Sequence, residues 1–228
     1  MANTFLCLDF GAFAVKAAEF EPNETGSLRL VNYALRPLGP DGFKEDERDE
    51  LVTNIVKEMI EEAEFKATDI NVCAPGFQVF SKFVKLPSVE ASKVNQIIQF
   101  EAQQNVPFPL DEVVWDYQIL GTTPNDELEI LLVAIRSEVV ESIFKIGSGA
   151  GLELQLVDVS SAALANSYRF NYGDTEGCVM LLDIGAKSCN LLFFEQGRIF
   201  SRGINIGANS ITQDFAAESK LDWDEAER

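Results

Sequence analysis

Apolar and polar positions alternate in short runs along the N-terminal part of the chain. Apolar runs cover residues 4–10, 15–21 and 28–36, and the polar stretch PNETGS separates the last two. Short apolar runs that are bounded by turn-forming residues are typical of β-strands joined in sequence. The pattern therefore predicts an antiparallel meander of three strands at the start of the fold.

The next segment has the spacing of a helix. Between residues 48 and 65, apolar side chains recur on one side and acidic side chains lie opposite, the apolar ones being Leu51, Ile55, Met59 and Ile60. The run DINVCAPG, residues 69–76, then predicts a buried strand that ends at a Pro-Gly pair. This order of elements is typical of an α/β domain in which helices cover a mixed sheet.

The pattern changes after Gly76, and the following segment predicts a self-contained α+β module. Its strands and helices are expected at residues 77–87, 89–105, 113–121, 127–136 and 137–151, with Ser88 as the cap of the first helix. The loop VPFPLDE, residues 106–112, contains either a hydrophobic plug beneath the module or an exposed groove. Because the module interrupts the α/β pattern, it is predicted to be an inserted small subdomain.

The interrupted domain is expected to resume with a strand over residues 152–159 and a helix over 160–170. A second apolar hairpin follows, then a helix capped at Asn209 and the start of an acidic helix. The predicted organisation is a first subdomain made of residues 1–76 and 152–170, an insert at 77–151, and the start of a second subdomain at 171–228. Since a full second subdomain needs roughly a hundred further residues, the sequence is expected to be truncated.

The first and second hairpins carry nearly the same sequence. Residues 6–21, LCLDFGAFAVKAAEFE, align without a gap on residues 180–195, so that Asp9 pairs with Asp183, Gly11 with Gly185 and Ala12 with Ala186. Such internal similarity indicates a duplicated half-domain. Two facing Asp-x-Gly hairpins would offer backbone N–H groups to a polyphosphate and two carboxylates to its Mg²⁺. The alternative is that each aspartate is an ordinary turn former at a strand end.

Composition excludes several classes of partner and of chemistry. The net charge of −19 argues against DNA, RNA and direct attraction to anionic lipid, all of which require a basic surface. The chain has no histidine, which removes histidine-based nucleophile systems and histidine metal sites. Its cysteines, Cys7, Cys73, Cys178 and Cys189, form no C-x-x-C pair. They are therefore expected to be buried, reduced thiols in a cytosolic protein.

Two longer segments add a resemblance to a known family. FEAQQNVPFPLDEVVWDYQILG, residues 100–121, and INIGANSITQDFA, residues 204–216, resemble the PilM family of type IV pilus assembly proteins, which is related to FtsA within the actin-like ATPase superfamily. The resemblance implies an actin-like (ribonuclease H-like) fold in which the complete protein binds ATP and Mg²⁺ between two halves. The adenosine-binding segment of the second half is expected to be missing from this chain. It also implies a partner, the cytoplasmic N-terminal peptide of a PilN-like membrane protein. The chain would then lie at the cytoplasmic face of the inner membrane and contact the membrane only through that partner.

The same resemblance implies roles for particular residues. Asp9 and Asp183 would hold Mg²⁺ through phosphate or water, and Lys16 would point at the phosphates. The other expected cofactor-binding residues are Gly11, Ala12, Phe13, Gly185, Ala186, Lys187 and Ser188. Asp183 and Asp158 would be the catalytic acids. Considered without the family, Lys16 could equally point to solvent, and Asp158 could be an acid favoured by a helix N-terminus.

The first loop departs from the family pattern, in which small hydroxyl residues follow the glycine. Here Ala12, Phe13 and Ala14 supply no side-chain donor, each such bond contributing about 1 kcal/mol, and the ring of Phe13 competes with a γ-phosphate for space. The favoured function is an assembly scaffold of a type IV pilus or related type II secretion platform, with at most weak ATPase activity. Self-association into a ring or filament stays open. The alternative is an active ATPase or phosphotransferase of the actin and sugar-kinase superfamily.

Overall fold

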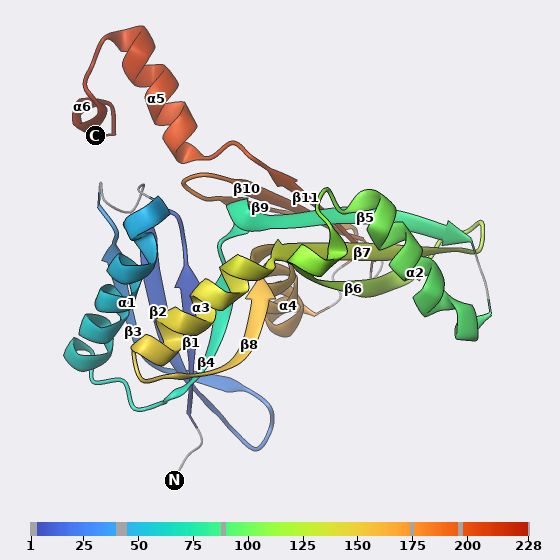
Figure 1. The fold of residues 1–228 in the computed structure, drawn as a ribbon, viewed down its shortest axis with the longest axis horizontal. Helices are drawn as coiled ribbons and strands as arrows, with labels where there is room; N and C mark the ends of the chain where they lie inside the picture. The colour runs from blue at the N-terminus through green and yellow to red at the C-terminus, as the bar shows by residue number, and fades with distance from the viewer. Residues whose placement is uncertain (1–3, 40–44, 88–89, 174–175, 196–197, 228) are drawn as a thin grey trace.

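The computed structural model describes residues 4–39, 45–87, 90–173, 176–195 and 198–227. Within these ranges the strands form three sheets, with the orders β3-β2-β1-β4-β8, β5-β7-β6 and β11-β10-β9. Figure 1 shows the first sheet and its helices at one end of the molecule, and the two smaller sheets side by side next to them. The predicted α/β class with a mixed sheet is confirmed.

The first sheet joins an antiparallel meander to two parallel strands. The meander consists of β1 (Phe5–Phe10), β2 (Ala14–Pro22) and β3 (Leu28–Pro37), and β4 (Asp69–Ala74) and β8 (Glu153–Val159) continue the sheet in parallel with β1. Side chains alternate between the two faces of a strand. Leu6, Leu8 and Phe10 are therefore buried on one face of β1, and Asp9 lies on the other.

Two helices cover the buried face of this sheet. α1 (Glu45–Glu62) and α3 (Ser137–Gly149) enclose the largest cluster of buried residues together with β1, β2 and β4. α1 begins and ends earlier than the predicted range of 48–65. Its end is fixed by Glu64, which has a φ of 53°, and by a bond from the Phe65 N–H to the Ile60 carbonyl. This is a left-handed C-terminal turn, which halts a helix wherever it forms.

The predicted insert contains a three-stranded sheet and a helix. β5 (Val79–Pro87), β7 (Glu127–Arg136) and β6 (Val113–Thr122) are antiparallel, and α2 (Ala91–Asn105) packs on them around Leu86, Ile98 and Ile130. The expected cap, Ser88, lies outside the described residues, and α2 has Glu90 at its N-cap position without a side-chain capping bond.

The VPFPL segment has features of both alternatives, the hydrophobic plug and the exposed surface. Val106 is buried in the cluster beneath α2 and Leu110 packs against that cluster, as expected of a hydrophobic plug. Phe108 remains 39% exposed, with the Arg136 guanidinium 5.9 Å from the centre of its ring. The short 3-10 helix η3 (Leu110–Glu112) then leads into β6. The segment therefore holds the insert together and also contributes one exposed ring.

Helices α3 and α4 connect the parts of the fold. α3 lies inside the predicted 77–151 insert, but Ile143 and Ile146 pack with the first sheet. α4 (Ser160–Tyr172) packs through Ala165 and Tyr168 against the third sheet. The predicted subdomain boundaries stay predictions, and this packing indicates that α3 is energetically part of the first subdomain.

The third sheet is a second antiparallel meander. It consists of β9 (Cys178–Ile184), β10 (Cys189–Glu195) and β11 (Arg198–Ile204), followed by α5 (Ala208–Ser219) and α6 (Trp223–Glu227). The prediction that Asn209 caps α5 is wrong, because Gly207 holds the N-cap position and Asn209 lies in the first turn. Among the described residues, no helix is long and apolar enough to cross a membrane.

Candidate functional site

The sequence repeat is also a repeat of strand register. In the first hairpin Asp9 lies opposite Lys16, and in the second Asp183 lies opposite Asn190. Each pair is seven residues apart, and each partner donates a hydrogen bond to its aspartate. The aligned positions of the two segments therefore occupy equivalent places in three dimensions. This equivalence extends to Lys16 and Asn190, which the sequence comparison had not matched as a functional pair.

The two glycines close their turns in the same way. A Cβ atom on Gly11 would lie 2.9 Å from the carbonyl oxygen of Ala14, and one on Gly185 would lie 2.8 Å from that of Ser188. Contacts this close with backbone atoms exclude a side chain at either position. The glycine in each Asp-x-Gly turn is therefore required by a close backbone approach.

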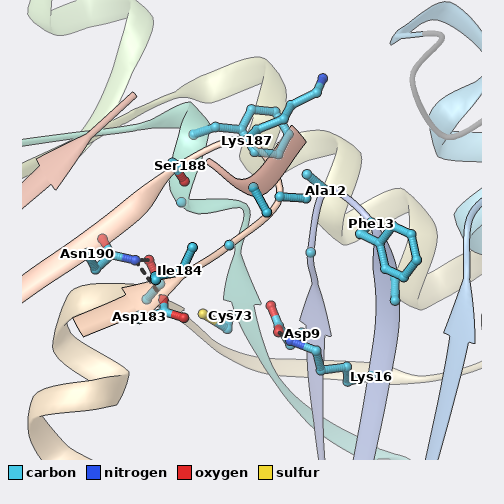
Figure 2. A pocket seen from close by; sticks show the side chains of 18 of the residues that line it. Asp9, Ala12, Phe13, Lys16, Cys73, Asp183, Ile184, Lys187, Ser188 and Asn190 are labelled. Carbon is cyan, nitrogen blue, oxygen red and sulfur yellow. Dashed lines mark hydrogen bonds and ion pairs between the residues drawn. The ribbon is translucent and has the colours of Figure 1, made fainter. Parts of the chain in front are cut away.

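The hairpins face each other across a cleft of about 740 Å³ (Figure 2). The residues predicted to bind the cofactor all line it, namely Asp9, Gly11, Ala12, Phe13, Lys16, Asp183, Gly185, Ala186, Lys187 and Ser188. The cleft is completed by residues between the hairpins in sequence, among them Cys73, Phe77 and Ser160. The structure thus brings the predicted cofactor-binding residues together, and their roles toward a nucleotide stay predictions.

In the first hairpin Lys16 is turned onto Asp9. Its Nζ lies 2.9 Å from Asp9 Oδ2, and the two side chains are 58% and 38% exposed. The hydrogen bond to Asp9 raises the pKa of Lys16, partial burial opposes it, and the negative charges of Asp9 and Asp183 add to the rise. Lys16 therefore stays charged, and its contact with Asp9 holds it at the edge of the cleft although its side chain is largely exposed.

In the second hairpin an amide takes the place of the lysine. Asn190 Nδ2 donates to Asp183 Oδ2 at 3.0 Å and also to Ser160 Oγ at 3.2 Å. Ser160 is the first residue of α4, so this bond joins the second hairpin to the connecting helix. Sequence reasoning missed both residues, although Asn190 stands at the repeat position of Lys16 and could have been found there.

Cys73 lies between the two acids in the cleft (Figure 2). Burial, with a further contribution from the negative charges of Asp9, Asp158 and Asp183, raises the pKa of its thiol to about 12, and Lys16 opposes this rise. The thiol is therefore neutral at physiological pH, and it places no further negative charge between the two aspartates.

The raised pKa of Cys73 predicts that the free energy of unfolding decreases at alkaline pH. Because an unfolded cysteine ionises near its ordinary value of 9.0 and folded Cys73 ionises near 12, the free energy of unfolding should decrease as the pH rises from 9 towards 12. Cys7, whose pKa is also raised by burial, acts in the same direction. Denaturant titrations at about pH 8 and about pH 10.5 should show a smaller decrease for Cys73→Ala than for the wild type. The expectation of burial is wrong for Cys178, which is exposed, so Cys178→Ala should keep the wild-type decrease. Equal slopes for both variants would contradict the assignment.

Asp158 is not among the cleft-lining residues. It lies beside Cys73 in the β4–β8 register, and its Oδ1 accepts the backbone N–H of Val159 at 2.8 Å. Burial raises the pKa of this carboxyl, and the bond from Val159 opposes the rise. Its predicted catalytic role stays a prediction. Its negative charge lies near Cys73 and contributes to the raised pKa of that thiol.

Arg48 of α1 supports the first loop from behind. Its guanidinium donates to the carbonyl oxygens of Gly11 at 2.8 Å and Phe10 at 3.3 Å, and burial lowers its pKa. With these carbonyls bound on the far side, the loop can turn backbone N–H groups towards the cleft. The ring of Phe13 is 54% exposed and lies on the side of the first hairpin away from the second loop (Figure 2).

The second loop is fixed by the start of α5. The backbone N–H of Ala208 donates to the Gly185 carbonyl at 2.9 Å, and that of Asn209 donates to the Ala186 carbonyl at 3.0 Å. A Cβ on Gly207 would lie 2.3 Å from the Ala186 carbonyl oxygen. The loop can hold this conformation only because Gly207 allows the helix to approach so closely.

The arrangement fits a metal–polyphosphate ligand. The described residues contain no cluster of three or more metal-ligating side chains, so a metal ion would be held through water and phosphate oxygens as well as by a carboxylate. Asp9 and Asp183 supply the carboxylates, Lys16 and Lys187 supply positive charge, and the glycine turns supply backbone N–H groups. These are the donors that a magnesium-bound phosphate chain requires.

Duplicated hairpins that share one register and face each other across a cleft define this chain as a protein of the actin-like ATPase fold. The family follows from the sequence as a whole. The chain belongs to the family of the type IV pilus assembly protein PilM, whose family model matches residues 7–228.

Solved structures agree with this fold. The PilM-PilN type IV pilus biogenesis complex matches with a TM-score of 0.82 and 24% identity over 97% of this chain and 67% of that chain. The cytoplasmic domain of EpsL, an inner membrane component of the type II secretion system of Vibrio cholerae, matches with a TM-score of 0.54 and 8% identity over 96% and 77% of the two chains. A Bacteroides thetaiotaomicron protein with an actin-like ATPase fold gives 0.53 and 10% over 97% and 79%.

Proposed function

We propose that this chain is a cytoplasmic scaffold of a type IV pilus assembly platform that binds Mg-ATP in the cleft and the N-terminal tail of a PilN-like membrane protein on a separate surface. The observation that carries the proposal is the repeated hairpin register, which directs Asp9 and Asp183 into one cleft in a chain of the PilM family. The proposal of a membrane partner is supported by the structural similarity of this chain to the PilM-PilN complex. The net charge of −19 supports attachment to the membrane through a protein and not through anionic lipid.

Within the cleft the two acids, Asp9 and Asp183, have different hydrogen-bond partners. Asp183 is held by the neutral amide of Asn190, whereas Asp9 is neutralised by Lys16. Asp183 would therefore be the acid that is available to water molecules bound to Mg²⁺. Lys16 would hold the phosphate chain in place of Asp9, because a polyphosphate carries the greater negative charge. Mg²⁺, when bound, would supply the charge neutralisation that allows a polyphosphate to lie between two carboxylates.

A second cavity, of about 310 Å³, is the proposed seat of the PilN-like tail. It lies between α1, α3 and the short 3-10 helix η2 (Gly76–Gln78), and its apolar walls include Phe77, Val139 and Ile143. Arg48, Asp49 and Glu138 place charges of both signs around it. A cavity that combines apolar walls with charged and polar groups fits a short peptide that inserts apolar side chains and is oriented by its polar groups.

The peptide site is tested by a matched pair of substitutions on α3. Ser142 lines the second cavity and Ser148 is exposed further along the same helix. Ser142→Arg should fill the cavity and weaken binding of a PilN-like N-terminal peptide by at least about tenfold, measured by fluorescence anisotropy. Ser148→Arg should bind the peptide as the wild type does.

The outcomes separate scaffold from enzyme. Equal peptide affinity in the two arginine variants would place the tail elsewhere. A steady rate of ATP turnover that disappears in Asp183→Ala would instead favour an active ATPase of the same superfamily. Peptide binding that depends on Ser142, without such turnover, supports the scaffold.

A further inference from the structure

The cleft and the second cavity share part of one wall. Phe77 and Lys187 line both of them, and Arg48 lines the second cavity only. Phe77 lies in η2, between β4 of the first sheet and β5 of the inserted sheet. Lys187 lies in the second hairpin turn, and Arg48 comes from α1. Elements from three separate parts of the sequence therefore meet at one half-buried aromatic ring.

Two cationic side chains, Lys187 and Arg48, lie near the ring of Phe77. Lys187 Nζ is 4.8 Å from the ring centre, and Arg48 Cζ is 5.9 Å from it. Both distances lie within the range of a cation–π interaction. Lys187 belongs to the second loop itself, and Arg48 is bonded to the Gly11 carbonyl in the first loop. The ring thus lies near a side chain of the second loop and near the arginine that is bonded to the first loop.

A polyphosphate in the cleft would compete with the ring for Lys187. Phosphate oxygens carry full negative charge, whereas the face of an aromatic ring offers only a quadrupole, so the ammonium group binds phosphate more strongly. When Lys187 turns to the phosphate it leaves the second cavity and uncovers one face of Phe77. An apolar side chain of a bound peptide can then pack on that face.

We propose that Phe77 is a coupling residue, which transmits occupancy of the cleft by a magnesium-bound polyphosphate to the peptide cavity through the displacement of Lys187. The inference rests on the proposed function, since it requires both ligands. It predicts positive coupling: the peptide binds more tightly when the cleft is filled. By thermodynamic linkage the peptide increases the affinity for the polyphosphate by the same factor.

Titrations of both ligands measure the coupling directly. The affinity for a PilN-like N-terminal peptide is measured with and without saturating Mg-tripolyphosphate, and the ratio should be about fivefold or more in the wild type. Phe77→Leu keeps an apolar side chain but has no π face, and its ratio should fall to about one. Phe77→Trp keeps the π face and should restore the ratio, which a purely structural role would not predict.

The outcomes distinguish the coupling from the function on which it depends. Binding of both ligands with a ratio of one in the wild type would overturn the coupling and leave the proposed function standing. Failure of the wild type to bind either ligand would overturn both. A ratio in Phe77→Leu equal to that of the wild type would show that the coupling takes another route and would overturn the role of Phe77.

A spectroscopic test needs no variant. Because Lys187 Nζ lies 4.8 Å from the ring centre, the ε-methylene protons next to it should show an upfield ring-current shift in the NMR spectrum of the free protein. Mg-tripolyphosphate should move this signal to the position of a solvated lysine. A signal that stays unchanged at saturating ligand would contradict the displacement of Lys187.

Discussion

Replacing Gly207 with alanine is expected to separate the start of α5 from the second loop and to weaken Mg-ATP binding by at least about tenfold. A Cβ there would lie 2.3 Å from the Ala186 carbonyl oxygen and 2.6 Å from that of Gly185, and neither backbone atom can move without changing the loop. Gly207 has an extended backbone, with a φ of −131°, so the cause is the close approach and not the dihedral angle. Calorimetric titration with Mg-ATP measures the loss.

Gly203 provides the matched control for this prediction. It lies on β11, just before the same helix, and a Cβ built on it meets no atom within 4 Å. Gly203→Ala should bind Mg-ATP as the wild type does. Hydrogen exchange at the amides of Ala208 and Asn209 gives a second measurement, because their bonds to the loop should open only in Gly207→Ala. Unchanged exchange and affinity in that variant would show that the helix does not fix the loop.

The largest expected effect on stability is that of Glu19→Ala. Glu19 is 1% exposed, and its Oε1 accepts the backbone N–H groups of Lys66 at 3.1 Å and Ala67 at 2.8 Å. Alanine would remove the acceptor of both bonds and leave the buried N–H of Ala67 without a partner, which should lower the free energy of unfolding by about 3 kcal/mol. Urea denaturation followed by circular dichroism measures this change.

Two further variants separate burial from charge at this position. Glu19→Gln keeps a carbonyl oxygen as acceptor and should cost only about 1 kcal/mol. Glu21→Ala, on the same strand, removes a glutamate whose partner is the surface residue Arg29, and should change stability by less than about 1 kcal/mol. A similar loss in Glu19→Ala and Glu21→Ala would contradict the structural role of the two backbone bonds.

Strands and turns could be predicted from the sequence because their signals are local. The apolar run after the turn TTPND predicted the observed limits of β7, Glu127–Arg136. The repeat of the Asp-x-Gly hairpins, together with the family resemblance, predicted a set of residues that all line the cleft. Helix ends were less predictable. Asn209 has the chemistry of a cap, but the start of α5 is set by the approach of Gly207 to a loop distant in sequence.

The parts of the site that were missed depend on strand order. Cys73 enters the cleft because β4 pairs with β1 so that Cys73 stands beside Asp9. β8 lies one strand further out, which places Asp158 beside Cys73 and outside the cleft-lining set. Neither neighbour relation is contained in the local sequence, since parallel strands are joined by long connections. The role of Phe77 likewise appears only when three distant segments meet.

The claim that the paired hairpins form a magnesium–phosphate clamp is tested most directly by calorimetric titration of this chain with Mg-ATP and with Mg-tripolyphosphate. The second ligand addresses the phosphate-binding groups without an adenosine. Both should bind the wild type, and Asp183→Asn should weaken both by at least about tenfold. Asp214→Asn, the same change at an exposed position on α5, should leave both affinities unaltered. Binding that is equal in the three proteins, or absent from the wild type, would contradict the clamp.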